Sequence, residues 1–199
     1  FGLGIKGGAG LNSMFVPGMS FALGYEGGIF ASLYVMDNLL LELDLIYEKR
    51  DEDFDANIIN ISGDDIIIES DLLGIQILGK YILDISGGGL NKSGSFGLSI
   101  PLGFRLNYHL QSRMTIDNNA YGFSENVSNI SIDGLAGVGF IYYLNEKMDI
   151  FADLLFDINI APAFYKPNFT TGDGTGSSSQ VEGRYWGIKL GIGFTIWKF

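Results

Sequence analysis

The stretch Gly183–Phe199, which reads GRYWGIKLGIGFTIWKF, alternates between two kinds of side chain. Its even positions from Trp186 to Ile196 are all large and apolar, whereas the odd positions from Gly187 to Thr195 are small or polar. A period of two places the two kinds on opposite faces of a β-strand. A tilted strand of about 9–11 residues crosses a bilayer, and this apolar face has the required length. The stretch is therefore predicted to be a strand of an outer-membrane β-barrel.

The same alternation recurs seven times earlier in the chain. The expected strands are about Gly2–Asn12, Phe21–Val35, Leu39–Glu48, Leu73–Tyr81, Phe96–Tyr108, Ile132–Leu144 and Asp149–Ile160. Each connection returns to the same pattern, so residues 1–199 are expected to form a single domain. The sequence predicts an all-β fold, an eight-stranded antiparallel up-and-down transmembrane barrel.

Long and short connections alternate along the chain. Long polar loops are expected at Arg50–Asp65, Gln111–Asn129 and Pro162–Glu182, and short turns follow the second and sixth strands. In outer-membrane barrels the long loops face the cell exterior and the short turns face the periplasm. We therefore expect a bacterial outer-membrane location with both termini periplasmic.

Composition narrows the function classes. The chain is 47% hydrophobic but only 18% charged, and it contains 29 glycines, no cysteine and one histidine. These counts argue against thiol chemistry and histidine-rich metal sites, so no cofactor is expected. The formal charge of −11 argues against nucleic acid as a partner. Because the chain begins directly on a strand-like segment, any signal peptide is expected to have been removed.

The opening GLGIKGGAGLN, the segment LLGIQILGKYIL at Leu72–Leu83 and the aromatic C-terminus carry a family resemblance. The chain resembles the small porin-like outer-membrane barrels of the OmpA, OmpX and PorT-like type. That resemblance covers nearly the whole chain, and it implies an architecture and a membrane location. It carries over no catalytic residue.

Strand alternation also predicts which charges face the barrel interior. Eight acids and four bases fall on the interior face, namely Glu26, Glu42, Asp44, Glu48, Asp133, Asp149, Asp153 and Asp157 with Lys6, Lys80, Arg105 and Lys189. Charges persist in a narrow interior when they are paired, so a salt-bridge network that plugs the lumen is the favoured interpretation. A proton or cation site made by the excess carboxylates is the alternative.

Three smaller features lead to further expectations. Aromatic residues near strand ends predict two interfacial girdles, with Tyr47, Tyr108 and Trp186 at the outer side and Tyr34, Tyr81, Phe96, Tyr142 and Trp197 at the inner side. Pro101, which cannot donate to a strand ladder, predicts a bulge. Phe199 falls on the interior face, so either a bulge occurs near Trp197 or the natural chain continues.

Two candidate sites lie near the expected outer rim. His109, with Gln111 and Ser112 nearby, is a candidate catalytic residue of a lipid-modifying hydrolase. A lone histidine at a rim is more often a structural polar residue. The segment Glu48–Asp71 has nine acids and two bases. The favoured interpretation is a solvated loop. The alternative is a divalent cation site that binds calcium, although the segment lacks the spacing of an EF-hand loop.

Gly63-Asp64-Asp65 separates two isoleucine-rich runs, which is the chemistry of a β-hairpin, so the third and fourth strands are expected to continue beyond the bilayer as a hairpin. Ile59, Ile61 and Ile67 on this hairpin are predicted to contact a partner. The function expected from these features is non-enzymatic, a surface anchor or a subunit of an outer-membrane protein complex. Its partners would be outer-membrane lipid and other outer-membrane or surface proteins. A narrow porin is the first alternative, and a lipid-modifying enzyme is the second.

Overall fold

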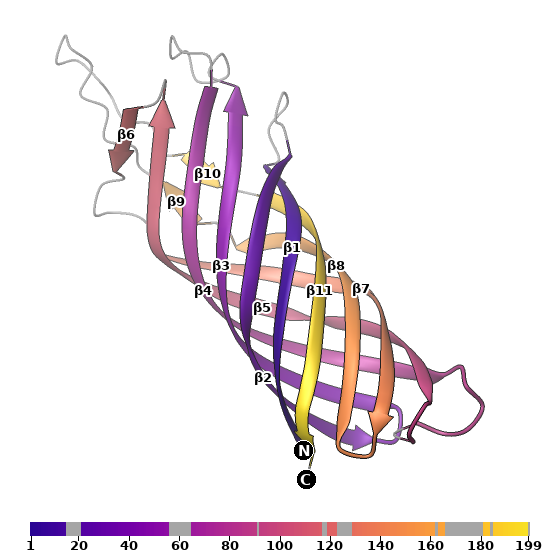
Figure 1. Ribbon diagram of the computed structural model, residues 1–199. Coiled ribbons are helices and arrows are strands. Elements are labelled where there is room, and N and C mark those ends of the chain that lie inside the picture. The colour runs from indigo at the N-terminus through magenta and orange to yellow at the C-terminus, as the bar shows by residue number, and fades with distance from the viewer. Residues whose placement is uncertain are drawn as a thin grey trace, which may run out of the picture.

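The computed structural model describes residues 1–14, 21–55, 65–90, 92–116, 119–122, 129–161, 163–165, 181–183 and 185–198. These residues form a β-barrel (Figure 1). Its strands are β1 (Gly2–Met14), β2 (Ala22–Met36), β3 (Leu39–Asp55), β4 (Asp65–Asp84), β5 (Phe96–Ile116), β7 (Ile130–Asn145), β8 (Met148–Ala161) and β11 (Tyr185–Lys198). Three shorter strands are β6 (Asn119–Gly122), β9 (Ala163–Tyr165) and β10 (Val181–Gly183).

Within the described ranges, eight strands form one sheet that closes into a ring. Each of them pairs in antiparallel fashion with its neighbour in the chain, and β1 pairs with β11 to complete the ring. The predicted eight-stranded antiparallel barrel is therefore confirmed. Both ends of the chain lie at the same end of the barrel (Figure 1). We call this the terminal end, and the opposite opening the far end.

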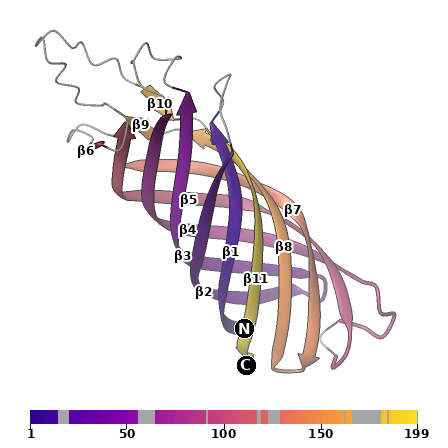
Figure 2. The same cartoon turned by 45° about the horizontal axis from the view of Figure 1, so that its top comes forward.

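The strands β3, β4 and β5 extend beyond the other strands at the far end (Figure 1), and Figure 2 shows this end turned toward the viewer. Residues 50–55 of β3 pair with residues 65–70 of β4, and residues 66–70 of β4 pair with residues 112–116 of β5. The short β6 adds to the outer end of β5. The loops predicted at Arg50–Asp65 and Gln111–Asn129 are therefore partly strand. The expected hairpin implied such a continuation of β3 and β4, whereas the continuation of β5 was not expected.

Two expectations about strand irregularities have different outcomes. A bulge occurs near Trp197, because Leu3 pairs with Trp197 while Gly4 pairs with Thr195. Ile196 and Trp197 are both exposed as a result, and the inside-outside alternation is inverted after them. The bulge predicted at Pro101 is wrong. The ladder between β5 and β7 is interrupted around Pro101 and resumes without a change of register, so the missing N–H removes pairing but adds no extra residue.

The outer face of the barrel is an apolar belt. Side chains such as Leu102, Phe104 and Leu23 are more than half exposed, as expected for a surface that meets hydrocarbon. Most of the predicted girdle aromatics lie on this face, but Tyr34 is an exception. It packs inside the barrel, where its hydroxyl lies 2.8 Å from that of Tyr143. Among the described residues there is no helix with the length and apolarity needed to cross a membrane.

The glycine-rich connection after β4 is ordered by one carboxylate. Asp84 accepts hydrogen bonds from the backbone N–H groups of Ser86 (2.9 Å) and Gly89 (2.6 Å), and from the Ser86 hydroxyl (2.7 Å). The Ser86 hydroxyl contributes most to lowering the pKa of Asp84 below its usual value. Gly87 and Gly89 have φ values of 69° and 92°, which favour glycine, so this sequence suits the turn.

Candidate functional site

The interior of the barrel holds the charges that strand alternation placed there. All twelve of the predicted acids and bases point inward, and their side chains are buried or nearly so, with Lys6 and Glu26 each 8% exposed. Such a density of buried charge is tolerated only where each group has partners. The contacts divide into two clusters along the barrel axis.

The lower cluster lies nearer the terminal end and contains Lys6, Glu42, Asp44, Lys80 and Asp153. The Lys80 ammonium lies 2.8 Å from Glu42 Oε2 and 2.6 Å from Asp153 Oδ2. The Lys6 ammonium lies 3.0 Å from Glu42 Oε1 and also contacts Asp44. Glu42 therefore bridges two ammonium groups that come from β1 and β4. The cluster has three carboxylates for two bases.

The upper cluster is centred on Glu48. Arg105 Nη1 lies 2.6 Å from Glu48 Oε2, and the Lys189 ammonium lies 2.8 Å from the same oxygen. Arg105 also lies 3.0 Å from Glu26, and Lys189 lies 2.8 Å from Asp157. Glu48 and Lys189 are 141 residues apart in sequence. The network therefore joins distant strands across the lumen.

Gln76 connects the two clusters. Its side-chain oxygen accepts hydrogen bonds from Arg105 Nε at 2.9 Å and Nη2 at 2.6 Å, and its amide nitrogen donates to Asp44 at 2.5 Å. Gln76 is fully buried. One continuous set of polar contacts thus extends along the lumen. Sequence reasoning placed Gln76 on the interior face without assigning it this bridging position.

Arg50 is an interior residue that the sequence reasoning missed. Its side chain is 1% exposed, and its guanidinium lies 3.0 Å from Glu48 Oε1 and 3.6 Å from the ring centre of Tyr185. The Tyr185 hydroxyl donates to Asp133, which also accepts a hydrogen bond from Asn107. Because Arg50 lies two residues after Glu48, continuing the alternation of β3 by one step would have found it.

The expected count of four interior bases is too low. The bulge near Trp197 turns Lys198 toward the interior, where its ammonium lies 2.5 Å from Asp149. With Arg50 and Lys198 included, six bases face the eight predicted acids. Full ionisation of these groups would leave a charge of −2, one excess carboxylate in each of the two clusters. This imbalance is half of what the sequence suggested.

An apolar layer lies inside the barrel near the terminal end. It contains Phe30, Leu40, Ile82, Ile141, Tyr143 and Phe151. The rings of Phe30 and Phe151 pack edge to face with 5.3 Å between their centres. Each ring occupies space beside a glycine, because a Cβ on Gly4 would lie 2.2 Å from Phe30 and one on Gly193 would lie 2.1 Å from Phe151. The interior charges read from strand alternation did not predict this apolar layer.

His109 also points into the lumen, and it is 7% exposed. Its Nε2 lies 3.2 Å from the hydroxyl of Ser131 on β7. The expected polar neighbour Gln111 is exposed instead, because an extra residue in β5 at Leu110 shifts the pairing with β4. The serine beside the histidine is therefore one that sequence spacing could not identify, since it comes from a different strand.

The predicted partner contacts lie at the edge of the described structure. Ile59 and Ile61 fall outside the described residues, and Ile67 is described only as a backbone position of β4, paired with Asp53 and Thr115. Within the described ranges no group of three or more acids or histidines is arranged to hold a metal ion. The cation expected at the acidic segment stays a prediction.

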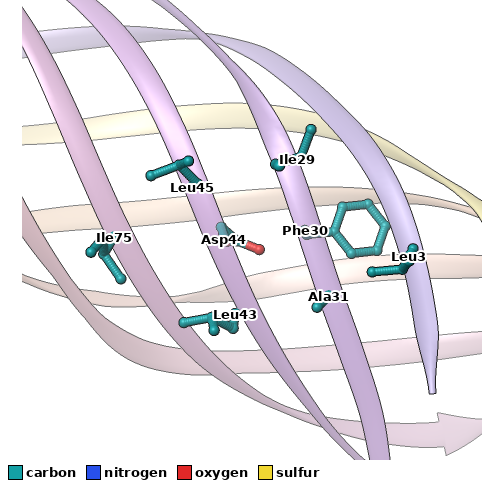
Figure 3. Close-up of a pocket in the computed structure, with 8 residues that line it drawn as sticks. All are labelled: Leu3, Ile29, Phe30, Ala31, Leu43, Asp44, Leu45 and Ile75. Carbon is teal, nitrogen blue, oxygen red and sulfur yellow. The ribbon is translucent and has the colours of Figure 1, made fainter.

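A hollow of about 300 Å³ lies on the outer face of the barrel. Figure 3 shows the apolar side chains around it, among them Leu3, Ile29, Leu43 and Leu45, with the short side chain of Ala31 between them. The hollow belongs to the apolar belt. Phe30 and Asp44, whose side chains pack inside the barrel, also line the hollow.

No family model and no curated protein matches the sequence. Among solved structures, a major outer membrane protein from Thermus thermophilus is 16% identical, with a TM-score of 0.54, over 98% of this chain and 100% of that chain. The outer membrane protein OprG from Pseudomonas aeruginosa is also 16% identical, with a TM-score of 0.54, over 98% and 96%. The chain has the fold of the small outer-membrane barrels. Neisserial surface protein A is 17% identical, with a TM-score of 0.48, over 100% of this chain and 98% of that chain.

Proposed function

We propose that the protein is a bacterial outer-membrane barrel that does not conduct and that serves as a surface anchor or a subunit of an outer-membrane protein complex. The filled lumen is the observation that carries this proposal. The charge network and the apolar layer around Phe30 and Phe151 occupy the interior, which supports a lumen without an open path for ions. In this proposal the terminal end is periplasmic, and the extension of β3, β4 and β5 lies outside the cell.

Single-channel recording tests the lumen. Purified protein in planar bilayers is expected to give no stable conductance steps, because charged side chains and aromatic rings occupy the space that ions would need. A general porin inserted in the same bilayers provides the positive control. Reproducible conductance from the wild-type protein would refute the closed lumen and favour the narrow porin.

A second test addresses the partner. The triple variant Ile59→Ser, Ile61→Ser and Ile67→Ser is expected to insert and fold normally but to lose a protein that co-purifies in mild detergent. Its matched control replaces three lipid-facing isoleucines of the barrel, Ile75, Ile77 and Ile100, with leucine, which keeps the belt apolar. Retention of every native partner by the serine variant would contradict the hairpin as the contact.

The contact between His109 and Ser131 supports one further candidate, a lipid-modifying enzyme. A serine activated by histidine could attack an ester. Lipid A mass spectra separate the two candidates. The spectra are compared for cells that carry the wild-type protein, cells that carry Ser131→Ala and cells that lack the protein. The anchor predicts three identical spectra, whereas an enzyme predicts a lipid species that only the wild-type protein changes.

A further inference from the structure

The hollow on the outer face of the barrel is a gap in the apolar belt at Ala31 of β2. The cross-strand partners of Ala31 are Leu3 on β1 and Leu43 on β3, and Ile29 lies beside it on the same face of β2. These three neighbours are between 43% and 59% exposed, whereas Ala31 is half-buried and ends at its Cβ. The short side chain therefore leaves a depression of about 300 Å³ among large aliphatic side chains (Figure 3).

The hollow offers van der Waals contacts to a ligand and almost nothing polar. Of the residues that line it, only Asp44 has a polar side chain. Its carboxylate lies inside the barrel, where Lys6 and Gln76 contact it. Water stays in a cavity when it has two to four polar partners, so water does not suit this hollow. If the hollow were empty, its lining side chains would lack contacts on one side. An apolar group is therefore the expected occupant.

A bilayer supplies two kinds of apolar occupant, a lipid chain and the surface of another protein. Protein surfaces gain little by meeting there, because lipid chains are as apolar as leucine. Protein association in a bilayer relies on polar contacts or on small residues that let two backbones approach, and the larger side chains around Ala31 keep a second backbone away. A flexible, unbranched chain can bend past those side chains. The hollow thus favours lipid.

The volume of the hollow suits part of one acyl chain. A methylene group takes up roughly the volume of a water molecule in the liquid, about 30 Å³, so a hollow of about 300 Å³ holds on the order of ten methylene groups. One wall of the hollow, Leu3, pairs with Trp197, which is exposed near the terminal end. Tryptophan side chains of this kind lie at the level of the lipid headgroups. A chain from the terminal-end leaflet can therefore enter the hollow along Leu3.

We propose that the hollow around Ala31 binds one acyl chain of a phospholipid, which stays with the barrel while the surrounding lipids exchange. The binding of a chain requires only the lipid-facing belt. The choice of phospholipid rests on the proposed function, in which the terminal-end leaflet is the periplasmic one and lipid A lies in the opposite leaflet. The bound chain completes the packing of the outer face between β1 and β3.

Native mass spectrometry of the full-length barrel in detergent micelles tests the site. The probe is palmitoyl-oleoyl phosphatidylethanolamine, added in increasing amounts, and the measured quantity is the Kd of the first bound lipid. Ala31→Leu fills the hollow and is expected to raise this Kd at least tenfold. Ala31→Val fills it in part and is expected to give a smaller rise.

Ala136→Leu is the matched control, because it makes the same change at an exposed position of β7 that does not line the hollow. It is expected to leave the Kd unchanged. Folded bands on unheated gels show that each variant has formed the barrel. Equal Kd values for the wild type, Ala31→Leu and Ala136→Leu would overturn the site, and so would a wild-type barrel that retains no lipid.

The same spectra test the other occupants. A dimer of the wild type that Ala31→Leu abolishes would assign the hollow to a second copy of the chain and would overturn the lipid. Lipid A at the same concentration is expected to leave the bound phospholipid in place. If lipid A displaces it from the wild type, the assignment to phospholipid is wrong.

The outcomes separate this inference from the proposed function. If Ala31→Leu binds the probe as the wild type does while planar bilayers show no conductance, the lipid site is wrong and the closed lumen stands. If the wild type conducts ions while Ala31→Leu loses the bound lipid, the closed lumen is wrong and the lipid site stands.

Discussion

Arg105→Ala is expected to lower the free energy of unfolding by about 3–5 kcal/mol, because its removal leaves buried carboxylates without their positively charged partner. Arg105 contacts Glu26, Glu48 and Gln76, and its side chain is fully buried. Without it, five bases face eight acids in the lumen. The excess of negative charge rises from two to three among side chains that are buried or nearly so.

Asp153→Ala is the matched comparison and is expected to cost less than half as much. It removes a carboxylate, so the excess of negative charge falls to one, and Lys80 keeps its contact with Glu42 at 2.8 Å. The free energy of unfolding of both variants is measured by urea titration in micelles. The folded and unfolded fractions are read from their separate bands on unheated gels. Adding Glu26→Gln to Arg105→Ala is expected to restore part of the loss. Equal destabilisation by Arg105→Ala and Asp153→Ala would refute the network as the source of stability.

Gly103→Ala is expected to destabilise the barrel by about 1–3 kcal/mol or to prevent its closure. A Cβ at this position would lie 1.9 Å from the carbonyl oxygen of Ile77 on β4. That atom belongs to the backbone and cannot rotate away as a side chain could. The two strands would have to separate where Leu78 pairs with Gly103.

Gly191→Ala is the control for this effect, because the nearest atom to a Cβ there, the carbonyl oxygen of Asp153, lies 4.0 Å away. Alanine also loses less backbone entropy than glycine in a strand, so this variant is expected to be neutral or slightly stabilising. Folding yield from urea into micelles distinguishes the two variants. A Gly103→Ala protein that folds as well as Gly191→Ala would show that the close approach of β4 and β5 is relaxed at little cost.

Sequence periodicity was sufficient for the architecture because each spanning strand meets lipid on one face and a packed interior on the other. The even positions of Gly183–Phe199 illustrate this, since the alternation gave both the strand and its outward face. The same signal stops where a strand leaves the bilayer. For that reason the continuation of β5 to Ile116 could be seen only in the backbone pairing, whereas that of β3 and β4 was expected from the two isoleucine-rich runs on either side of Gly63-Asp64-Asp65.

Alternation also shows which residues face the lumen, but it does not show which of them meet. The contacts of Glu48 with Lys189 and Arg105 depend on the tilt of the strands and on the stagger between β3, β5 and β11. The parity of Phe199 pointed to a bulge near Trp197, but it did not show that the bulge would bring Lys198 to Asp149. Tyr34 was misplaced because an aromatic residue near a strand end fits both a girdle and the apolar layer inside the barrel.

The continuity of β3 and β4 through the rim of the barrel has a mechanical consequence. Every residue of β3 from Leu39 to Asp55 has a partner in β4, so the extension and the barrel wall share one ladder. A pulling force along these strands would act on that ladder in shear, and its hydrogen bonds would carry the load together. A hairpin attached through a flexible loop would instead open one pair at a time. Tension on a partner held at the extension would thus pass directly into the barrel wall, where the surrounding bilayer resists it.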